Sequence, residues 1–245
     1  MAIWVIADLH LSFGAPDKKM DVFGPKWAGY TDQIKTHWLD SVSAEDLVLI
    51  PGDISWAMSL DRAQIDLEWI EALPGTKVII KGNHDYWWGS YAKVKQMLPP
   101  TIHAIQNNAF EWKGVSIGGA RLWDSEEYDF NPFIDFTEPP PLLSKEKLLD
   151  RQKLFNRELE RLELSLKELD QEASMRIVMT HYPPIGADLK TSRAAALLEK
   201  YKVQICVFGH LHNVKEGSLS FGQTRGVRYF LTSCDFLNFR PLKIV

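Results

Sequence analysis

Histidine and aspartate side chains gather in this sequence at the ends of short apolar segments. Seven histidines occur in the 245 residues, and five of them directly follow a strand-like run, in turns that also carry Asp, Asn or Gly. The turns read Asp8-Leu9-His10, Gly52-Asp53, Gly82-Asn83-His84-Asp85, His181 and Gly209-His210-Leu211-His212. Because ligands collect at the carboxyl ends of strands in an open α/β sheet, side chains from five separate turns can meet at one place.

Each turn offers side chains suited to binding a cation or moving a proton. Residues two apart in an extended segment project to one side, so Asp8 and His10 can hold one ion together. The pair His210 and His212 has the same spacing. The two oxygens of the Asp53 carboxylate could bridge two cations, which no single imidazole can do.

The turn after the third strand combines three kinds of polar group. Asn83 offers a neutral carbonyl oxygen, and His84 can donate a proton or present positive charge to a transition state. Asp85 can accept a hydrogen bond from one ring nitrogen of His84 and so fix its tautomer. A glycine-asparagine turn with a surface histidine is the alternative interpretation of this segment.

The five turns together indicate a metal site, although each taken alone fits a solvated turn, a helix cap or a structural histidine. A packed protein does not gather several carboxylates, an amide and five imidazoles without a partner that satisfies them. Oxygen and nitrogen ligands without a thiolate suit Mn, Fe, Zn, Co or Ni. Two cations about 3.5–4 Å apart would offset the negative charge and assist a displacement at phosphorus.

Alternating strand-like and helix-like segments must position these turns, and they predict an α/β protein. The expected strands are Ile3–Ala7, Leu47–Ile50, Lys77–Ile80, Val115–Gly118, Arg176–Thr180, Gln204–Phe208, Tyr229–Thr232 and Leu242–Val245. The expected helices are Thr31–Ser41, Leu60–Leu73, Ser90–Leu98, Ser144–Glu172 and Thr191–Tyr201. No repeat or long linker divides residues 1–245, so we expect a single domain.

Residues 124–172 look like an insertion made of a loop and a long charged helix. The loop, 124–143, carries Tyr128, Phe130, Phe133, Phe136 and three consecutive prolines, and could cover the site. The helix carries a narrow apolar seam of Phe155, Leu159, Leu162, Leu166 and Leu169. This seam either docks on the body of the same chain or forms a helix-pair contact in a homodimer.

Composition narrows the possible functions and locations. With 45% hydrophobic and 24% charged residues, the chain resembles an ordinary globular protein. Its 28 basic and 32 acidic residues give a net charge of −4, which argues against a broad nucleic-acid-binding face. Cys206 and Cys234 are expected to be buried free thiols. The first residues lack a signal peptide and a membrane span, so we expect a cytoplasmic protein.

The ordered turns resemble the calcineurin-like metallophosphoesterase superfamily, whose signature is D-x-H, G-D, G-N-H-D/E, H and G-H-x-H. All five blocks are present in this order between residues 8 and 212. The resemblance, which is to the bacterial and archaeal predicted phosphohydrolases of the superfamily, implies a four-layer α/β/β/α sandwich of two mixed sheets around two divalent metals. Manganese is the first expectation, with iron, zinc, cobalt or nickel as alternatives.

The resemblance also implies roles for the residues that match the motifs. It implies one metal held by Asp8, His10 and His212, a second held by Asn83, His181 and His210, and Asp53 as the bridge. It further implies that a hydroxide between the metals attacks phosphorus. His84 would stabilise the transition state or protonate the leaving oxygen, with Asp85 orienting its ring.

Other classes of protein remain open on the sequence. The UDP-diacylglucosamine pyrophosphatases are similar at residues 7–11, but they carry arginine where this chain has His84. A nuclease of the same fold is a further alternative, as is a non-enzymatic scaffold, although no motif residue is missing here. A small phosphorylated substrate is the expected partner.

Aromatic and basic residues near the motifs suggest contacts to the substrate. Aromatic side chains could stack on a flat group of the substrate, or they could belong to the core. The aromatic candidates are Trp56, Tyr86, Trp87, Trp88 and Trp123. Arg121 and Arg193 could contact phosphate oxygens, with surface ion pairs as the alternative.

Overall fold

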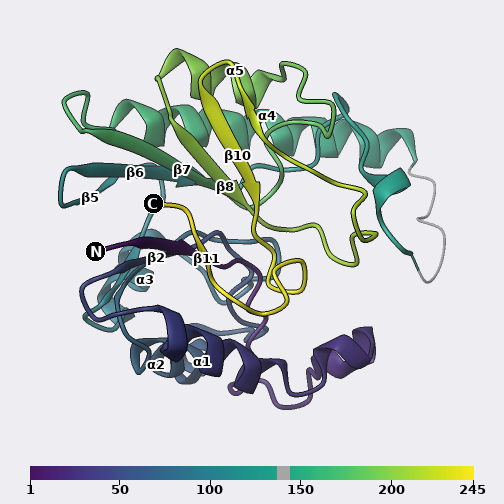
Figure 1. Cartoon of the computed structure of the whole chain (residues 1–245). Coiled ribbons are helices and arrows are strands. Elements are labelled where there is room, and N and C mark those ends of the chain that lie inside the picture. The colour runs from purple at the N-terminus through teal and green to yellow at the C-terminus, as the bar shows by residue number, and fades with distance from the viewer. Residues whose placement is uncertain (137–143) are drawn as a thin grey trace.

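Two β-sheets pack face to face in this structure, a computed structural model that describes residues 1–136 and 144–245 (Figure 1). The first sheet has the strand order β11-β1-β2-β3-β4, and the second has the order β5-β6-β7-β8-β10-β9. The strands are β1 (Ile3–Val5), β2 (Leu47–Ile50), β3 (Thr76–Ile79), β4 (Ile102–Ala104), β5 (Phe110–Trp112), β6 (Val115–Ala120), β7 (Met175–Thr180), β8 (Ile205–Phe208), β9 (Gln223–Thr224), β10 (Val227–Leu231) and β11 (Leu242–Lys243).

The strands that precede the motif turns pair in parallel. β1 pairs with β2 and β2 with β3 in the first sheet, while β6, β7, β8 and β10 pair in sequence in the second. Among the named strands of the described residues, the antiparallel pairs are those that β11, β5 and β9 make at the sheet edges. Parallel strands end at the same edge of a sheet, so the turns that follow them are brought together there.

Helices cover the outer face of each sheet and complete four layers. They are α1 (Tyr30–Ser41), α2 (Leu60–Glu71), α3 (Tyr91–Met97), α4 (Lys145–Lys167) and α5 (Arg193–Lys200), together with 3₁₀ turns η1 (Met20–Phe23), η2 (Pro25–Trp27) and η3 (Asn131–Phe133). One apolar cluster joins the two sheets, a second lies under α1 to α3, and a third lies under α4 and α5. The predicted α/β/β/α sandwich is therefore confirmed.

The buried face of each strand explains why these segments pair as they do. All four residues of β2 and of β8 are fully buried, as expected for strands covered on both faces.

β4, β5 and β9 were not predicted from the sequence. Each is only two or three residues long, which is too short for an alternating pattern to be visible.

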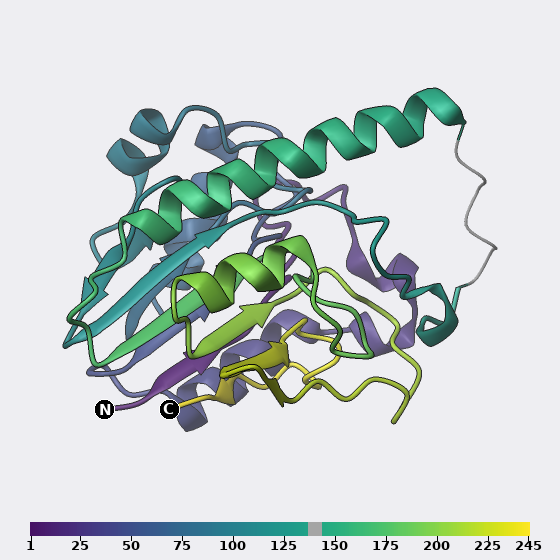
Figure 2. The same ribbon diagram turned by 90° about the horizontal axis from the view of Figure 1, so that it is seen from above.

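The long helix α4 lies along the outer face of the second sheet, and its N-terminal end extends beyond the strands (Figure 2). Phe155, Leu162, Leu166 and Leu169 of its apolar seam are all buried against their own chain. The seam therefore docks on the body of the same protein, which is the first of the two interpretations. A homodimer through the rest of the helix stays a prediction.

In the described residues, α4 included, no helix is both long and apolar enough to span a membrane.

The loop before α4 is tied to the rest of the protein at several points. The Tyr128 hydroxyl donates to the carbonyl of Pro183 at 2.6 Å, and the Asp135 amide donates to the carbonyl of Asn213 at 2.9 Å. The predicted loop 124–143 is described as far as residue 136. Its three prolines, at 139–141, lie outside the described residues.

Candidate metal centre

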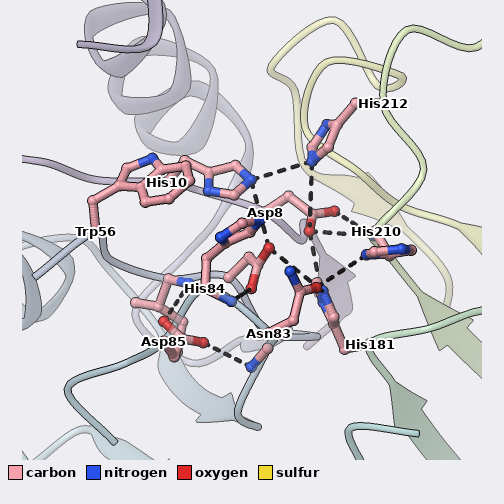
Figure 3. Close-up of polar contacts among 12 residues, drawn as sticks. Asp8, His10, Trp56, Asn83, His84, Asp85, His181, His210 and His212 are labelled. Atoms are coloured by element: carbon pink, nitrogen blue, oxygen red, sulfur yellow. Dashed lines mark hydrogen bonds and ion pairs between the residues drawn. The ribbon is translucent and has the colours of Figure 1, made fainter. Parts of the chain in front are cut away.

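The motif turns of both sheets converge on one buried cluster (Figure 3). Asp8, His10, Asp53 and His181 are each no more than 3% exposed, although all carry polar side chains. Asp8, His10, Asp53 and His210 also have left-handed backbone angles, with φ of 60°, 45°, 52° and 72°. This conformation costs energy in non-glycine residues, and residues that adopt it are common at functional sites. Here it turns each side chain away from the direction of the preceding strand.

Two glycines of the motifs allow the turns to approach this closely. A Cβ atom on Gly82 would lie 2.1 Å from Oδ1 of Asp53. A Cβ atom on Gly209 would lie 2.3 Å from Oδ2 of Asp8. Any side chain at these positions would displace the carboxylates, which explains why the sequence has glycine before the Asn-His and His-x-His segments.

The first group of candidate ligands consists of Asp8, His10 and His212. Their ligand atoms lie within 4.8 Å of one another, and Nε2 of His10 is 3.2 Å from Nε2 of His212. These residues come from the ends of β1 and β8, so one side chain from the second sheet faces two from the first. The structure brings together the three side chains that the motifs assign to one metal.

The second group lies next to the first and shares Asp8 with it. Ligand atoms of Asp8, Asp53 and His181 lie within 4.8 Å of one another. Oδ1 of Asn83 is 2.7 Å from Nε2 of His181 and 3.1 Å from Nδ1 of His210. The Asn83 amide therefore joins this group, as the motifs predict.

Asp53 lies between the two groups, where a bridging ligand would stand. Its Oδ2 atom is 3.7 Å from Nε2 of His10 in the first group and 3.4 Å from Nε2 of His181 in the second. Its other oxygen accepts a hydrogen bond from the His84 amide at 2.8 Å, which fixes the orientation of the carboxylate.

The hydrogen bonds of His181 leave an acceptor facing an acceptor. Its Nδ1 atom donates to the carbonyl oxygen of Pro51 at 3.0 Å, and burial lowers the pKa of the ring to about 3. The Nε2 atom is therefore unprotonated, yet it faces the oxygen of Asn83. Two facing lone pairs repel each other unless a cation lies between them, so this pair of atoms fits a metal site.

The pKa values of the carboxylates point in the same direction. Burial raises the pKa of Asp8 to about 8, against the opposing effect of His212, and burial also raises the pKa of Asp53. Burial lowers the pKa values of His10 and His210 well below the usual range. A divalent cation binds neutral imidazoles and ionised carboxylates, and its charge would compensate the buried negative charge of these carboxylates.

Asp235 belongs to the site but was not identified from the sequence. Its Oδ1 atom accepts a hydrogen bond from Nδ1 of His212 at 2.8 Å, and its Oδ2 atom accepts from the Asn213 amide at 3.0 Å. Burial lowers the pKa of His212, but the bond to Asp235 and the negative charges of Asp8, Asp235 and Asp53 together outweigh this effect and raise the pKa to about 9. Asp235 follows β10 in a polar turn, like the motif residues, and that position was the available signal.

His84 lies where it can reach a substrate. Its ring is 4.5 Å from the ring of Trp56 and 5.7 Å from that of His10, and it lines the large cavity over the cluster. Its Nδ1 atom is buried without a hydrogen-bond partner among the described residues. Burial lowers the pKa of the ring. The position of the His84 ring, at the cavity next to the cluster, is consistent with the predicted proton donor.

Asp85 has a different role from the one predicted. Its carboxylate accepts four hydrogen bonds, from the amides of Ile54, Ser55 and Gly82 and from Nε1 of Trp87, at 2.7–3.1 Å. The His84 ring is not among its partners, so the prediction that Asp85 orients this ring is corrected. Because Asp85 is fully buried and its partners lie in two motif turns, it holds the turn of Asp53 against that of Asn83.

A cavity of about 1040 Å³ opens onto the cluster and is lined by aromatic side chains. Trp56 and Trp123 lie in its wall, as the substrate interpretation requires. Trp87 and Trp88 are only 3% and 2% exposed and belong to the core, so the alternative interpretation holds for them. Tyr86 is exposed and its ring lies 6.1 Å from that of His84.

The two arginines suggested as phosphate ligands are both engaged in ion pairs. Arg193 lies 3.5 Å from the carboxylate of Glu127, near the protein surface. Arg121 lies 3.0 Å from the carboxylate of Glu158. Both side chains thus form the ion pairs of the alternative interpretation, and neither lines the large cavity over the metal cluster.

Comparisons with known proteins give the family and a matching fold. The chain is 37% identical over 84 residues to the Gene 66 protein of Mycobacterium phage D29, a match that covers 34% of this chain and 40% of the phage protein. A protein of unknown function from Aquifex aeolicus, AQ665, superposes with a TM-score of 0.50 at 16% identity, over 99% of this chain and 95% of that one. A phosphopantetheinyl hydrolase from Mycobacterium tuberculosis gives a TM-score of 0.49 at 14% identity, over 100% of this chain and 95% of that one.

The likeness to AQ665 concerns the fold alone, and the chain spans less than half the length of the phage relative that it matches. The model of the calcineurin-like phosphoesterases, in contrast, matches residues 1–214, which include every motif turn described above. The structure brings those turns together at one buried cluster. This chain belongs to the calcineurin-like phosphoesterase family.

Proposed function

We propose that the protein is a dinuclear metal-dependent phosphohydrolase that cleaves phosphomonoester or phosphodiester bonds. The observation that carries the proposal is the pair of adjacent ligand groups that share Asp8 and have Asp53 between them. Their candidate ligand atoms lie 2.7–3.9 Å apart, which is close enough for one cation to contact several of them at once.

Seven side chains hold the metals in this proposal. One cation would be held by Asp8, His10 and His212, the other by Asn83, His181 and His210, and Asp53 would serve both. When bound, two divalent cations lower the pKa of water and offset the charge that develops on the phosphoryl oxygens. Manganese is the first candidate, followed by iron, zinc, cobalt and nickel, because mixed nitrogen and oxygen ligands suit all five.

The protein's own residues orient the site and handle the proton. The His84 ring lies at the boundary between the cluster and the cavity, where it can stabilise charge on a phosphoryl oxygen or donate a proton to the leaving oxygen. Its main-chain amide donates to Asp53, which ties the backbone of the His84 turn to the candidate bridging carboxylate. Asp235 and the Pro51 carbonyl hold the rings of His212 and His181 through their second nitrogens.

The cavity over the cluster supports a small phosphorylated molecule as substrate. About 1040 Å³ is enough for a ligand of nucleotide or head-group size. The aromatic wall near the cluster, with Trp56 and Trp123, favours a leaving group with a flat or apolar surface. Cys206 and Cys234 are both free and buried, which supports a reducing compartment such as the cytoplasm.

A metal-reconstitution assay tests this function. The protein is stripped with a chelator, each divalent metal is added back, and hydrolysis of p-nitrophenyl phosphate is compared with that of bis-p-nitrophenyl phosphate. We expect turnover only with metal, and we expect Asp53→Asn to lose most of it while keeping the folded state. Full activity of that variant at limiting metal would refute the proposal. Cleavage of a supercoiled plasmid, measured alongside, would instead favour a nuclease.

A further inference from the structure

A second, smaller cavity lies beside the metal centre and carries an excess of positive charge. It has a volume of about 250 Å³ and is formed by the turns after β3, β4 and β6 together with the middle of α4. It shares no lining residue with the large cavity over the metal cluster, so the two are separate among the described residues.

Four cationic side chains line this cavity and only one carboxylate accompanies them. The cations are Lys81, Arg121, Arg157 and Arg161, and the carboxylate is Glu158. The formal charge of the lining is therefore +3. Clustered cations repel one another unless an anion balances them, and here one buried carboxylate is shared by three guanidinium groups.

The contacts of Glu158 show how incomplete this compensation is. All three arginines approach the same oxygen, Oε1, at 3.0 Å from Arg121, 2.8 Å from Arg161 and 3.6 Å from Arg157. The Glu158 side chain is only 2% exposed, so its charge is held inside the lining of the cavity. The distance to Arg157 exceeds that of a hydrogen bond, which leaves its donors available.

Further donors in the cavity lack a partner. The Nε atom of Arg121 is buried and makes no hydrogen bond within residues 1–136 and 144–245. Nζ of Lys81 donates to the carbonyl of Trp88 at 2.8 Å, and no carboxylate of the described chain forms an ion pair with it. A buried guanidinium nitrogen with no acceptor is costly, and an oxyanion would supply that acceptor.

We propose that this cavity binds a phosphate-type oxyanion. Guanidinium groups recognise phosphate oxygens through paired, charge-assisted hydrogen bonds, and Lys81 adds a point charge. Since a water molecule takes about 30 Å³ in the liquid, about 250 Å³ holds a phosphate group with several waters. A bound dianion would offset most of the +3 charge of the lining.

The position of the cavity connects this site to the metal centre. The carbonyl oxygen of Arg121 accepts hydrogen bonds from the amides of His181 and Tyr182, at 3.1 and 2.9 Å. Lys81 immediately precedes the turn of Asn83. The oxyanion could be a second phosphate group of the substrate or free inorganic phosphate, and binding itself does not depend on the hydrolytic activity proposed above.

Calorimetric titration of the full chain with inorganic phosphate tests the proposal. With metal removed by chelator, the acidic metal cluster offers no phosphate site, so binding reports the basic cavity alone. The double variant Arg157→Gln/Arg161→Gln keeps the pair of Arg121 and Glu158, and we expect it to bind phosphate at least tenfold more weakly. Ionic strength is held constant because salt screens such contacts.

Two further variants make the result specific. Lys153→Gln/Lys167→Gln removes the same charge from exposed positions of α4 outside the cavity, and we expect phosphate affinity close to that of the unaltered protein. Glu158→Gln removes the single carboxylate and should tighten phosphate binding, so the two cavity variants change affinity in opposite directions. Absence of phosphate binding by the unaltered protein, or equal affinity in all variants, would overturn the proposal.

Kinetics with metal-loaded protein distinguish the two sources of the anion. If the anion is part of the substrate, Arg157→Gln/Arg161→Gln raises KM for a substrate with two phosphate groups and leaves KM for a monophosphate unchanged. If the anion is free phosphate, the double variant changes KM for both substrates by the same factor, and its weaker binding of inorganic phosphate in calorimetry remains. Because the calorimetry uses metal-free protein, failure of the hydrolytic proposal would leave its outcome unaffected.

Discussion

Replacement of Asp235 by asparagine tests whether the metal cluster depends on a residue outside the sequence motifs. The Asp235 carboxylate is 3% exposed and accepts one hydrogen bond with each oxygen, from Nδ1 of His212 and from the Asn213 amide. Asparagine has a single acceptor oxygen of this kind. In Asp235→Asn, one of the two N–H donors must therefore face an NH₂ group.

The size of the effect follows from what the carboxylate does to His212. It holds a proton on Nδ1, so Nε2 is the nitrogen that gives up its proton when a cation binds, and its negative charge makes the ring a more basic ligand. Loss of such a partner lowers metal affinity or activity by about 10–100-fold. This corresponds to about 1.4–2.7 kcal/mol at 1.36 kcal/mol per tenfold change.

Competition against a chelator of known affinity gives the metal affinity of each variant, with metal content measured directly on the equilibrated protein. We expect Asp235→Asn to bind the tightest-bound metal about 10–100-fold more weakly and to recover much of its phosphoesterase activity at saturating metal. Asp46→Asn is the matched control. Asp46 is also buried, and it accepts hydrogen bonds from the Ala2 and Ser43 amides, but it precedes β2 at the opposite edge of the sheet.

Unchanged metal affinity in Asp235→Asn would refute the reasoning, because it would mean that His212 needs no fixed tautomer to bind. A tenfold loss of metal affinity in the control Asp46→Asn would also refute the reasoning. Such a loss would mean that lowered stability alone, and not the contact to His212, weakens metal binding. Thermal unfolding of the metal-free proteins separates the two cases, as Asp46→Asn should lower stability without a specific effect on metal.

Three further predictions address the proton donor, the long helix and a buried lysine. His84→Ala should lower kcat by about 10²–10⁴-fold with metal content unchanged, and loss of metal from that variant would show that His84 is itself a ligand. Leu162→Ala removes a fully buried side chain of the α4 seam and should lower the free energy of unfolding by about 2–5 kcal/mol, whereas the exposed Leu164→Ala should change it by about 0.5 kcal/mol or less in urea titrations. Burial lowers the pKa of Lys77 from 10.5 to about 8, so between these values the unfolded chain holds a proton that the folded chain has released, and stability should rise with pH across this window. Lys77→Met should abolish that rise, measured as unfolding midpoints at pH 7.5 and pH 10; an identical slope in both proteins would contradict the assignment.

The main strands and all five helices followed from the sequence because their patterns are long enough to be visible. The structure places both ends of α1, α2, α3 and α5 within two residues of the predicted limits, whereas α4 ends at Lys167 rather than at the predicted Glu172. The short edge strands β4, β5 and β9 were missed because backbone hydrogen bonding to a neighbour, rather than the pattern of their own residues, makes them strands.

The structure brings the predicted motif residues together, but it differs from the sequence in the contacts of single residues. Asp85 was assigned to the His84 ring because the two are adjacent in the sequence, whereas its oxygens reach the amides of another turn. Asp235 was missed because its relation to His212 spans 23 positions of the chain. The partner of a hydrogen bond is set by distance in space, which sequence spacing does not report.

The sequence by itself determined the family, the α/β class and the set of polar turns, because strand periodicity and ordered motifs are local properties of the chain. Only the tertiary structure decided which lone pairs face each other, which aromatic residues line the cavity, and that three arginines share one carboxylate beside the metal centre. Those features arise where the two sheets and α4 pack against one another. The contacting residues lie far apart in the sequence, so packing in three dimensions decides which of them meet, and no local sequence pattern reports it.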